Sequence, residues 1–146
     1  MENKEIDILL IEDNANDAEL AIRALQKNNL AKRIVHLKDG AAALDFLFGE
    51  GIYKGRNVHN KPKVILLDLK MPKVSGLEVL ERLTTNELTK QIPVVVLTSS
   101  KEHPDVEKAY LLGANSYIVK PVDFESFRKV VNDLGIYWLL LNQPSL

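Results

Sequence analysis

Short apolar runs alternate with longer amphipathic stretches along most of the chain, and this alternation constrains the fold more than any other feature. Five runs have the length and the Val, Ile and Leu content of buried strands, and they cover residues 6–11, 34–37, 64–67, 94–97 and 117–119. Because apolar residues follow one another almost without interruption, both faces of each strand should be covered. The pattern predicts an α/β fold of five βα units, with a five-stranded parallel sheet and helices on both faces.

The stretches between these runs carry apolar residues three or four positions apart, as Ala18, Ala21 and Leu25 do in the first one, which is the period of an α-helix. The fourth helix should begin at Pro104 and end at Gly113, because proline suits a first helical turn and glycine suits the residue after a helix. Asp123 is a good N-cap for the fifth helix.

Length and composition narrow the class of protein. A chain of 146 residues is the usual size for one domain, so we expect a single domain over 1–146 with its core at about 5–134. The chain has no cysteine, which excludes disulfides and thiolate metal sites. The longest apolar run, 136–141, is too short to span a bilayer, and the charged segment 1–5 does not resemble a signal peptide. These features predict a cytoplasmic protein without a membrane partner.

The formal net charge is −1, so no overall positive field would attract nucleic acid, and we expect no nucleic-acid partner. One segment, residues 49–63, interrupts the alternation: it is polar, has three glycines, and carries five basic residues without an acid after Glu50. Two interpretations stay open for it, a solvated surface loop and a dedicated site for an anion or a partner.

Chemically active side chains follow four of the five predicted strands. They are Glu12 and Asp13 after the first strand, Asp68 after the third, Thr98 after the fourth and Lys120 after the fifth. Ligands of open α/β sheets bind beyond the carboxyl ends of the strands, where these residues should meet if the first and third strands are neighbours. Three carboxylates in one small volume repel one another unless one is protonated or a divalent cation lies between them, and Mg²⁺ prefers such oxygen ligands.

Each of these residues also has an ordinary structural explanation. Asp13 could cap the first helix, Asp68 could be a turn residue, Thr98 could be a β-branched strand residue, and Lys120 could be a solvated charge. The four strand ends together favour a site for phosphoryl chemistry assisted by a metal ion.

Four motifs resemble the receiver domain of two-component response regulators, of which CheY-like proteins are the simplest. They are Ile-Leu-Leu-Ile-Glu12-Asp13-Asn14, Leu-Leu-Asp68-Leu-Lys-Met71-Pro72, Val-Val-Leu-Thr98-Ser-Ser and Tyr117-Ile-Val-Lys120-Pro121. The resemblance covers about residues 5–134, and the spacings from Asp68 to Thr98 and from Thr98 to Lys120 agree with the family as well.

The resemblance implies a flavodoxin-like (βα)₅ fold with strand order 2-1-3-4-5. It also implies that Asp68 is the phospho-acceptor, taking the phosphoryl group from a phosphohistidine of a sensor histidine kinase or a phosphotransfer protein. Glu12, Asp13, Asp68 and the backbone carbonyl of Lys70 would hold Mg²⁺. Lys120 would neutralise the phosphoryl charge, and the Lys120–Pro121 bond would be cis.

In this family, Thr98 and Tyr117 would be the switch residues, which transmit the change to a surface made by the helix from Pro104, the strand 117–119 and the helix after Asp123. Such a protein is not an enzyme in the usual sense, and carries out at most slow self-catalysed phosphotransfer and dephosphorylation. The alternative is a receiver-like interaction module that acts by dimerisation without phosphorylation.

Three features look like the small receivers that partner bacterial phytochromes: the segment 49–63, the helix opening at 14–20 and the apolar tail 135–146. That subgroup implies a phytochrome-like sensor kinase and a homodimer formed through the same helix–strand–helix surface. We expect the tail to extend the fifth helix. It could then reach a second subunit or fold back on its own core.

Overall fold

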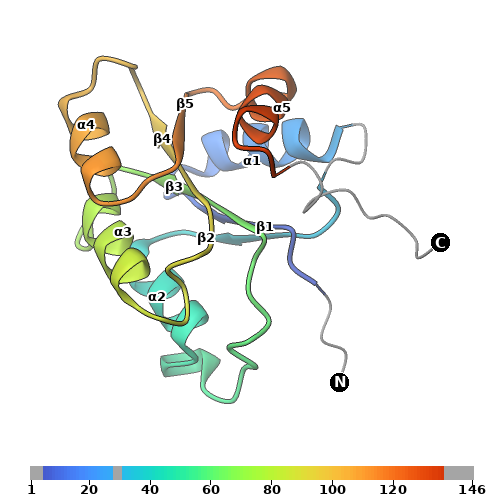
Figure 1. Cartoon of the computed structure of the whole chain (residues 1–146). Helices are drawn as coiled ribbons and strands as arrows, with labels where there is room; N and C mark the ends of the chain where they lie inside the picture. Colours follow the sequence, from blue (N-terminus) through green and yellow to red (C-terminus); the bar gives the residue numbers. More distant parts are fainter. Residues whose placement is uncertain (1–4, 28–30, 137–146) are drawn as a thin grey trace.

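The structure is a computed structural model that describes residues 5–27 and 31–136 (Figure 1). Its five strands are β1 (Ile8–Ile11), β2 (Ile34–Leu37), β3 (Val64–Asp68), β4 (Val94–Thr98) and β5 (Ser116–Val119). They form one parallel sheet in the order β2-β1-β3-β4-β5. The predicted flavodoxin-like fold and its strand order are therefore confirmed.

Helices cover both faces of the sheet, as the sequence predicts. They are α1 (Ala15–Gln26), α2 (Gly40–Phe48), α3 (Gly76–Thr85), α4 (Pro104–Leu111) and α5 (Phe124–Asp133). Figure 1 shows α1 and α5 together on one face, while α2, α3 and α4 lie on the other. Among the helices of the described ranges, none has the length and apolar character needed to cross a membrane.

Neighbouring residues of each central strand belong to different hydrophobic cores. In β1, Leu9 and Ile11 pack with the core under α2, α3 and α4, whereas Ile8 and Leu10 pack with the core under α1 and α5. Side chains alternate between the faces of a strand, and both faces here are covered. This two-sided burial is why the strands consist of almost unbroken apolar runs.

The predicted helix boundaries are confirmed where the sequence carries a local signal. Asp123 accepts a hydrogen bond from the Ser126 amide and caps α5, and Pro104 is the first residue of α4. Gly113 follows the end of α4 with φ 107°, a conformation that glycine adopts without steric cost.

Some strand boundaries differ from the prediction. The first strand begins at Ile8 and not at residue 6, and just before it the Asp7 carboxylate accepts the backbone N–H groups of Lys32 and Arg33. The strands β3 and β4 include Asp68 and Thr98 as their last residues. Both side chains therefore project from rigid strand ends and not from the loops that follow.

The helix α5 ends at Asp133, two residues before Gly135, whose φ is 67°. The predicted extension of the fifth helix over residues 135–146 is therefore wrong for residues 135 and 136. The rest of that prediction concerns residues 137–146, which lie outside the described residues.

Arg56 is one of the residues that hold the segment 49–63 to the body of the protein. The guanidinium of Arg56 lies 3.8 Å from the centre of the Phe46 ring and donates to the backbone carbonyls of Phe46 and Asn60. Burial, with a smaller contribution from the charge of Arg33, lowers the pKa of Arg56. Lys63 pairs with Glu5 and Asp7. Two of the five basic residues are thus used for internal contacts, which favours the surface-loop interpretation over an anion site.

The first residue of α3, Gly76, lies against the strand end that carries Asp68. A Cβ atom at this position would come within 2.3 Å of the Asp68 carbonyl oxygen, which is backbone and cannot move aside. The close approach of α3 to the end of β3 therefore requires glycine.

We predict that Gly76→Ala lowers the free energy of unfolding by about 3 kcal/mol, because the methyl group would push α3 away from β3. Urea denaturation measures this change. Gly135→Ala is the control: among the described residues its Cβ atom would meet no atom within 4 Å, so the φ of 67° should set its cost at about 1 kcal/mol. Equal losses for the two variants would contradict the proposed steric origin.

Candidate functional site

Three carboxylates meet at the carboxyl edge of the sheet. Strands β1 and β3 are neighbours with Ile11 opposite Leu67, so the residues that follow, Glu12 and Asp68, lie side by side. Oxygen atoms of Glu12, Asp13 and Asp68 all lie within 4.8 Å of one another. Glu12 and Asp68 are 1% and 3% exposed, whereas Asp13 is exposed to solvent. The cluster is therefore reached from solution at Asp13, while the other two acids lie inside the protein.

The Lys120 ammonium lies among these acids. It stands at the end of β5, and its Nζ is 3.2 Å from Glu12 Oε1 and 3.3 Å from Asp68 Oδ1. The Lys120 amide donates to the Thr98 carbonyl at 2.7 Å, and the Lys120–Pro121 bond is cis, as predicted. Lys120 is thus not a solvated charge but the cation that neutralises part of a buried acidic cluster.

Burial and neighbouring charges both shift the pKa values of Asp68 and Lys120. Burial, followed by the neighbouring Glu12 carboxyl group, raises the pKa of Asp68 from 3.8 to about 7, although Lys120 opposes this rise. Burial alone would lower the pKa of Lys120, but the charges of Asp68 and Glu12 outweigh it and raise that pKa. The site keeps an excess of negative charge that a cation from solution would relieve.

The donor set fits a hard divalent cation. Carboxylate oxygens from Glu12, Asp13 and Asp68 are the type of ligand that Mg²⁺ takes together with water, and the chain has no cysteine to supply a thiolate. The turn that carries the first two acids is fixed in place, because His36 of β2 donates from Nε2 to the Glu12 carbonyl oxygen at 2.8 Å. The same turn begins α1, whose N-cap is Asn14.

Thr98 lies beside this cluster and ties it to α4. A small cavity of about 50 Å³ is lined by both Asp68 and Thr98. The Thr98 hydroxyl donates to the Ser100 carbonyl at 2.9 Å, and the same carbonyl accepts from the His103 amide at 3.1 Å. His103 in turn accepts from the Asp105 amide through Nδ1 and caps α4. One chain of hydrogen bonds thus connects Thr98 with the first turn of α4.

The two remaining predicted residues occupy different places. Lys70 is exposed next to the site, and its amide donates to Asp68 Oδ1 at 3.3 Å. Tyr117 is half-buried on β5, outside the acidic cluster, with its ring edge-on to Tyr110 of α4 at a centroid distance of 6.3 Å. The structure therefore brings Glu12, Asp13, Asp68, Thr98 and Lys120 together and leaves Tyr117 on the adjoining surface.

Two residues near the site were missed from the sequence. Asp17, in the first turn of α1, has a carboxylate oxygen 3.5 Å from Lys120 Nζ. His103 lines the small cavity with Asp68. Each could have been found from its position, because the first turn of a helix that follows a strand lies at the same sheet edge as the strand end.

We predict that, without divalent metal, Asp68→Asn stabilises the protein, and more so at pH 8 than at pH 5. The folded protein binds a proton at Asp68 more tightly than the unfolded chain does, so the wild type loses stability as the pH rises from 3.8 to about 7. The full effect of such a rise in pKa is roughly 4 kcal/mol, and we expect about 2 kcal/mol between pH 5 and 8. Urea denaturation at both pH values measures it.

Glu19→Gln is the matched control for this experiment, because Glu19 is an exposed acid on α1 that pairs with Arg23. Its effect on the free energy of unfolding should stay below about 0.5 kcal/mol at both pH values. A gain for Asp68→Asn that does not depend on pH would contradict the electrostatic explanation.

The chain matches the family model of the response regulator receiver domain over residues 8–132. It is 44% identical to the probable methanogenesis regulatory protein FilR2 of Methanothrix harundinacea over 93% of this chain and 85% of that protein. It is 38% identical to the response regulator Rcp1 of Synechocystis over 90% of this chain and 88% of that protein.

Solved structures agree with this assignment. The bacteriophytochrome response regulator RtBRR matches with a TM-score of 0.85 at 48% identity, covering 97% of this chain and 85% of that one. The phosphorylated cyanobacterial phytochrome response regulator RcpA matches with a TM-score of 0.74 at 35% identity, covering 98% and 99%. The Mn²⁺-bound form of Rcp1 matches with a TM-score of 0.73 at 35% identity, covering 97% and 99%.

The family model, the curated relatives and the solved structures all identify the same fold and the same protein class. The chain belongs to the response regulator receiver domains of two-component signalling, and it is similar to receivers associated with phytochromes.

Proposed function

We propose that this receiver accepts a phosphoryl group on Asp68 from a phosphohistidine of a sensor histidine kinase or a phosphotransfer protein. The observation that carries the proposal is the pairing of Asp68, a nearly buried carboxylate, with the Lys120 ammonium at 3.3 Å inside a cluster of further acids. The similarity to RcpA, whose phosphorylated form has been solved, supports it. By the same similarity, a phytochrome-like kinase is the proposed partner.

Mg²⁺ is the metal ion that we assign to this site. Glu12, Asp13 and Asp68 would hold it with their carboxylates, together with the backbone carbonyl of Lys70. Bound there, the ion would offset negative charge on the acids and on the phosphoryl oxygens. The similarity to the Mn²⁺-bound form of Rcp1 supports a divalent ion at the site. The three carboxylates offer only oxygen ligands, which suit Mg²⁺.

The protein's own residues position and neutralise the transfer. An Asp68 carboxylate oxygen attacks the phosphorus atom, and a P–O bond forms while the P–N bond to the histidine breaks and its electron pair stays on the imidazole nitrogen. The Lys120 ammonium forms an ion pair with one phosphoryl oxygen. The Thr98 hydroxyl, which borders the same cavity as Asp68, donates a hydrogen bond to another phosphoryl oxygen. Phosphoryl transfer needs mainly such alignment and charge stabilisation.

The proposed switch begins at Thr98. Its hydroxyl donates to the Ser100 carbonyl in this structure, and that hydrogen bond must break when the hydroxyl turns to a phosphoryl oxygen. Because Ser100 also accepts from the His103 amide at the start of α4, the loss changes how the loop holds this helix. Tyr117, packed edge-on against Tyr110 of α4, is placed to respond by a change of rotamer.

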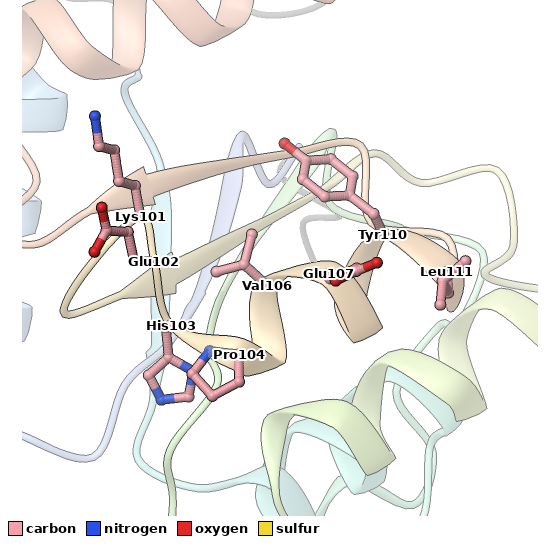
Figure 2. Close-up of a pocket in the computed structure, with 8 residues that line it drawn as sticks. All are labelled: Lys101, Glu102, His103, Pro104, Val106, Glu107, Tyr110 and Leu111. Carbon is pink, nitrogen blue, oxygen red and sulfur yellow. The ribbon is translucent and has the colours of Figure 1, made fainter.

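The surface that would change contains a hollow beside α4. The hollow has a volume of about 480 Å³, and Figure 2 shows its lining side chains gathered along α4 and the loop before it: Lys101, Glu102, His103, Pro104, Val106, Glu107, Tyr110 and Leu111. Leu111 is 83% exposed, and Tyr110 and Val119 are exposed as well. Apolar side chains exposed together on α4 and β5 favour a protein partner, and we propose that this α4–β5–α5 surface forms a homodimer.

The proposed function is that of a signalling switch in the cytoplasm. As such, the protein is not an enzyme in the usual sense and carries out at most slow self-catalysed phosphotransfer and dephosphorylation. The second candidate function is an interaction module that acts by dimerisation alone, which the exposed apolar residues of α4 and β5 also support. The two functions differ in one expectation: only the first requires that phosphorylation of Asp68 changes the self-association of the protein.

Phosphorylation is tested by incubating the protein with Mg²⁺ and acetyl phosphate and measuring the intact mass. We expect a gain of one phosphoryl group for the wild type and no gain for Asp68→Asn. Asp133→Asn is the control and should gain the group as the wild type does. Asp133 is an exposed acid at the C-terminal end of α5, where it pairs with Lys129. Omission of Mg²⁺ should slow the gain by about tenfold or more. An equal gain for the wild type and Asp68→Asn would disprove the role of Asp68.

Dimerisation is tested by light scattering with the variant Leu111→Asp. A carboxylate buried in the interface without a partner should weaken self-association by about tenfold or more. Leu20→Asp is the control, because Leu20 is an exposed leucine of α1, on the other face of the sheet. A dimer that Asp68→Asn and acetyl phosphate leave unchanged would favour the second candidate function.

A further inference from the structure

The Lys120 ammonium has a third carboxylate partner beyond the predicted site. Asp17 Oδ2 lies 3.5 Å from Lys120 Nζ, so Glu12, Asp68 and Asp17 surround one ammonium group at 3.2–3.5 Å. The side chain of Asp17 is 37% exposed, whereas those of the other two acids are almost fully buried. Asp17 therefore reaches Lys120 from the solvent side of the site.

Helix capping does not account for the direction of this side chain. In α3 the acid at the third helical position, Glu78, accepts from the amide of the N-cap residue Ser75 at 3.3 Å, which completes a capping box. Asp17 holds the same position in α1, but the amide of the N-cap residue Asn14 donates to Glu12 Oε2 at 3.2 Å. Within residues 5–27 and 31–136, the Asp17 carboxylate pairs with Lys120.

We propose that Asp17 is a positioning residue that holds the Lys120 ammonium toward α1 in the protein without a phosphoryl group, and thereby opposes phosphoryl binding. This inference rests on the proposed function of Asp68. A lysine ammonium has three N–H donors, and here three carboxylates lie around it. The ammonium donates a hydrogen bond to Glu12, and the carboxylates of Asp68 and Asp17 lie at ion-pair distance, so a phosphoryl oxygen that approaches Lys120 competes with carboxylates already around it.

Asp17 is the partner that Lys120 can leave at the lowest cost. An ion pair with a partly exposed acid is screened by water and contributes little, whereas a buried carboxylate left without its cation is strongly destabilised. The negative charge of Asp17 also repels the incoming anionic group. The ion pair with Lys120 and the charge repulsion both weaken phosphoryl binding, so Asp17 lowers the affinity for the phosphoryl group modestly.

The test is the affinity for fluoroberyllate, a stable anionic analogue of the phosphoryl group, titrated in saturating Mg²⁺ and followed by NMR chemical shifts. Asp17→Asn should bind fluoroberyllate about two- to fivefold more tightly than the wild type, the range expected for a partly exposed ion pair. Asp17→Glu restores the charge and should return to the wild-type affinity. Glu19→Gln, which removes an acid of α1 that pairs with Arg23 instead, should not change the affinity.

A double-mutant cycle separates positioning from general charge repulsion. If Asp17 acts through Lys120, the effect of Asp17→Asn is clearly smaller in the Lys120→Gln background, where only the direct charge repulsion remains. Tightening of the same size in this background, or equal tightening by Glu19→Gln, would overturn the positioning role. Urea denaturation of each variant confirms that it is folded before titration.

The outcome also separates this inference from the proposed function. A folded wild type that binds no fluoroberyllate and gains no phosphoryl mass overturns the role of Asp68, and the role of Asp17 with it. A wild type that binds, together with an Asp17→Asn variant of unchanged or weaker affinity, overturns only the role of Asp17.

Discussion

Burial of like charges at one sheet edge is the constraint on which the rest of this structure depends. Glu12 and Asp68 are almost inaccessible to water, yet two unit charges about 4 Å apart repel by about 4 kcal/mol even at an effective dielectric constant near 20. The Lys120 ammonium, placed by the end of β5, offsets part of this repulsion. Burial, followed by the neighbouring Glu12 carboxyl group, raises the pKa of Asp68, and the cluster of acids makes the site receptive to a cation.

The same constraint connects the site with the molecular surface. The hydroxyl of Thr98 and the carboxylate of Asp68 border one small cavity, and the carbonyl of Ser100 receives hydrogen bonds from both Thr98 and the first turn of α4. A change of charge at Asp68 therefore acts on a side chain that already shares its partner with α4. In the proposed switch, the exposed apolar residues of α4 and β5 would transmit this change to another protein.

Much of this organisation could be predicted because it depends on local sequence. Strands covered on both faces must be continuously apolar, which identified all five strands, and helix-start signals such as Asp123 and Pro104 act within a few residues. The cluster itself was predicted from a general property of parallel sheets, whose carboxyl ends share one edge. The extension of the fifth helix was wrong for residues 135 and 136, because Gly135 adopts a left-handed conformation that ends a helix.

The sequence alone determined the secondary structure, the strand ends and the chemical types that gather there. Only the tertiary structure decided which charges touch: Lys120 and Glu12 are 108 positions apart, and their pairing depends on β1, β3, β4 and β5 lying in one sheet. It also decided that the Asn14 amide bonds to Glu12 and that Asp17 faces Lys120. The physical reason is that a cap or a strand is selected by nearby residues, whereas an ion pair is selected by whichever opposite charge the folded chain brings within a few ångströms.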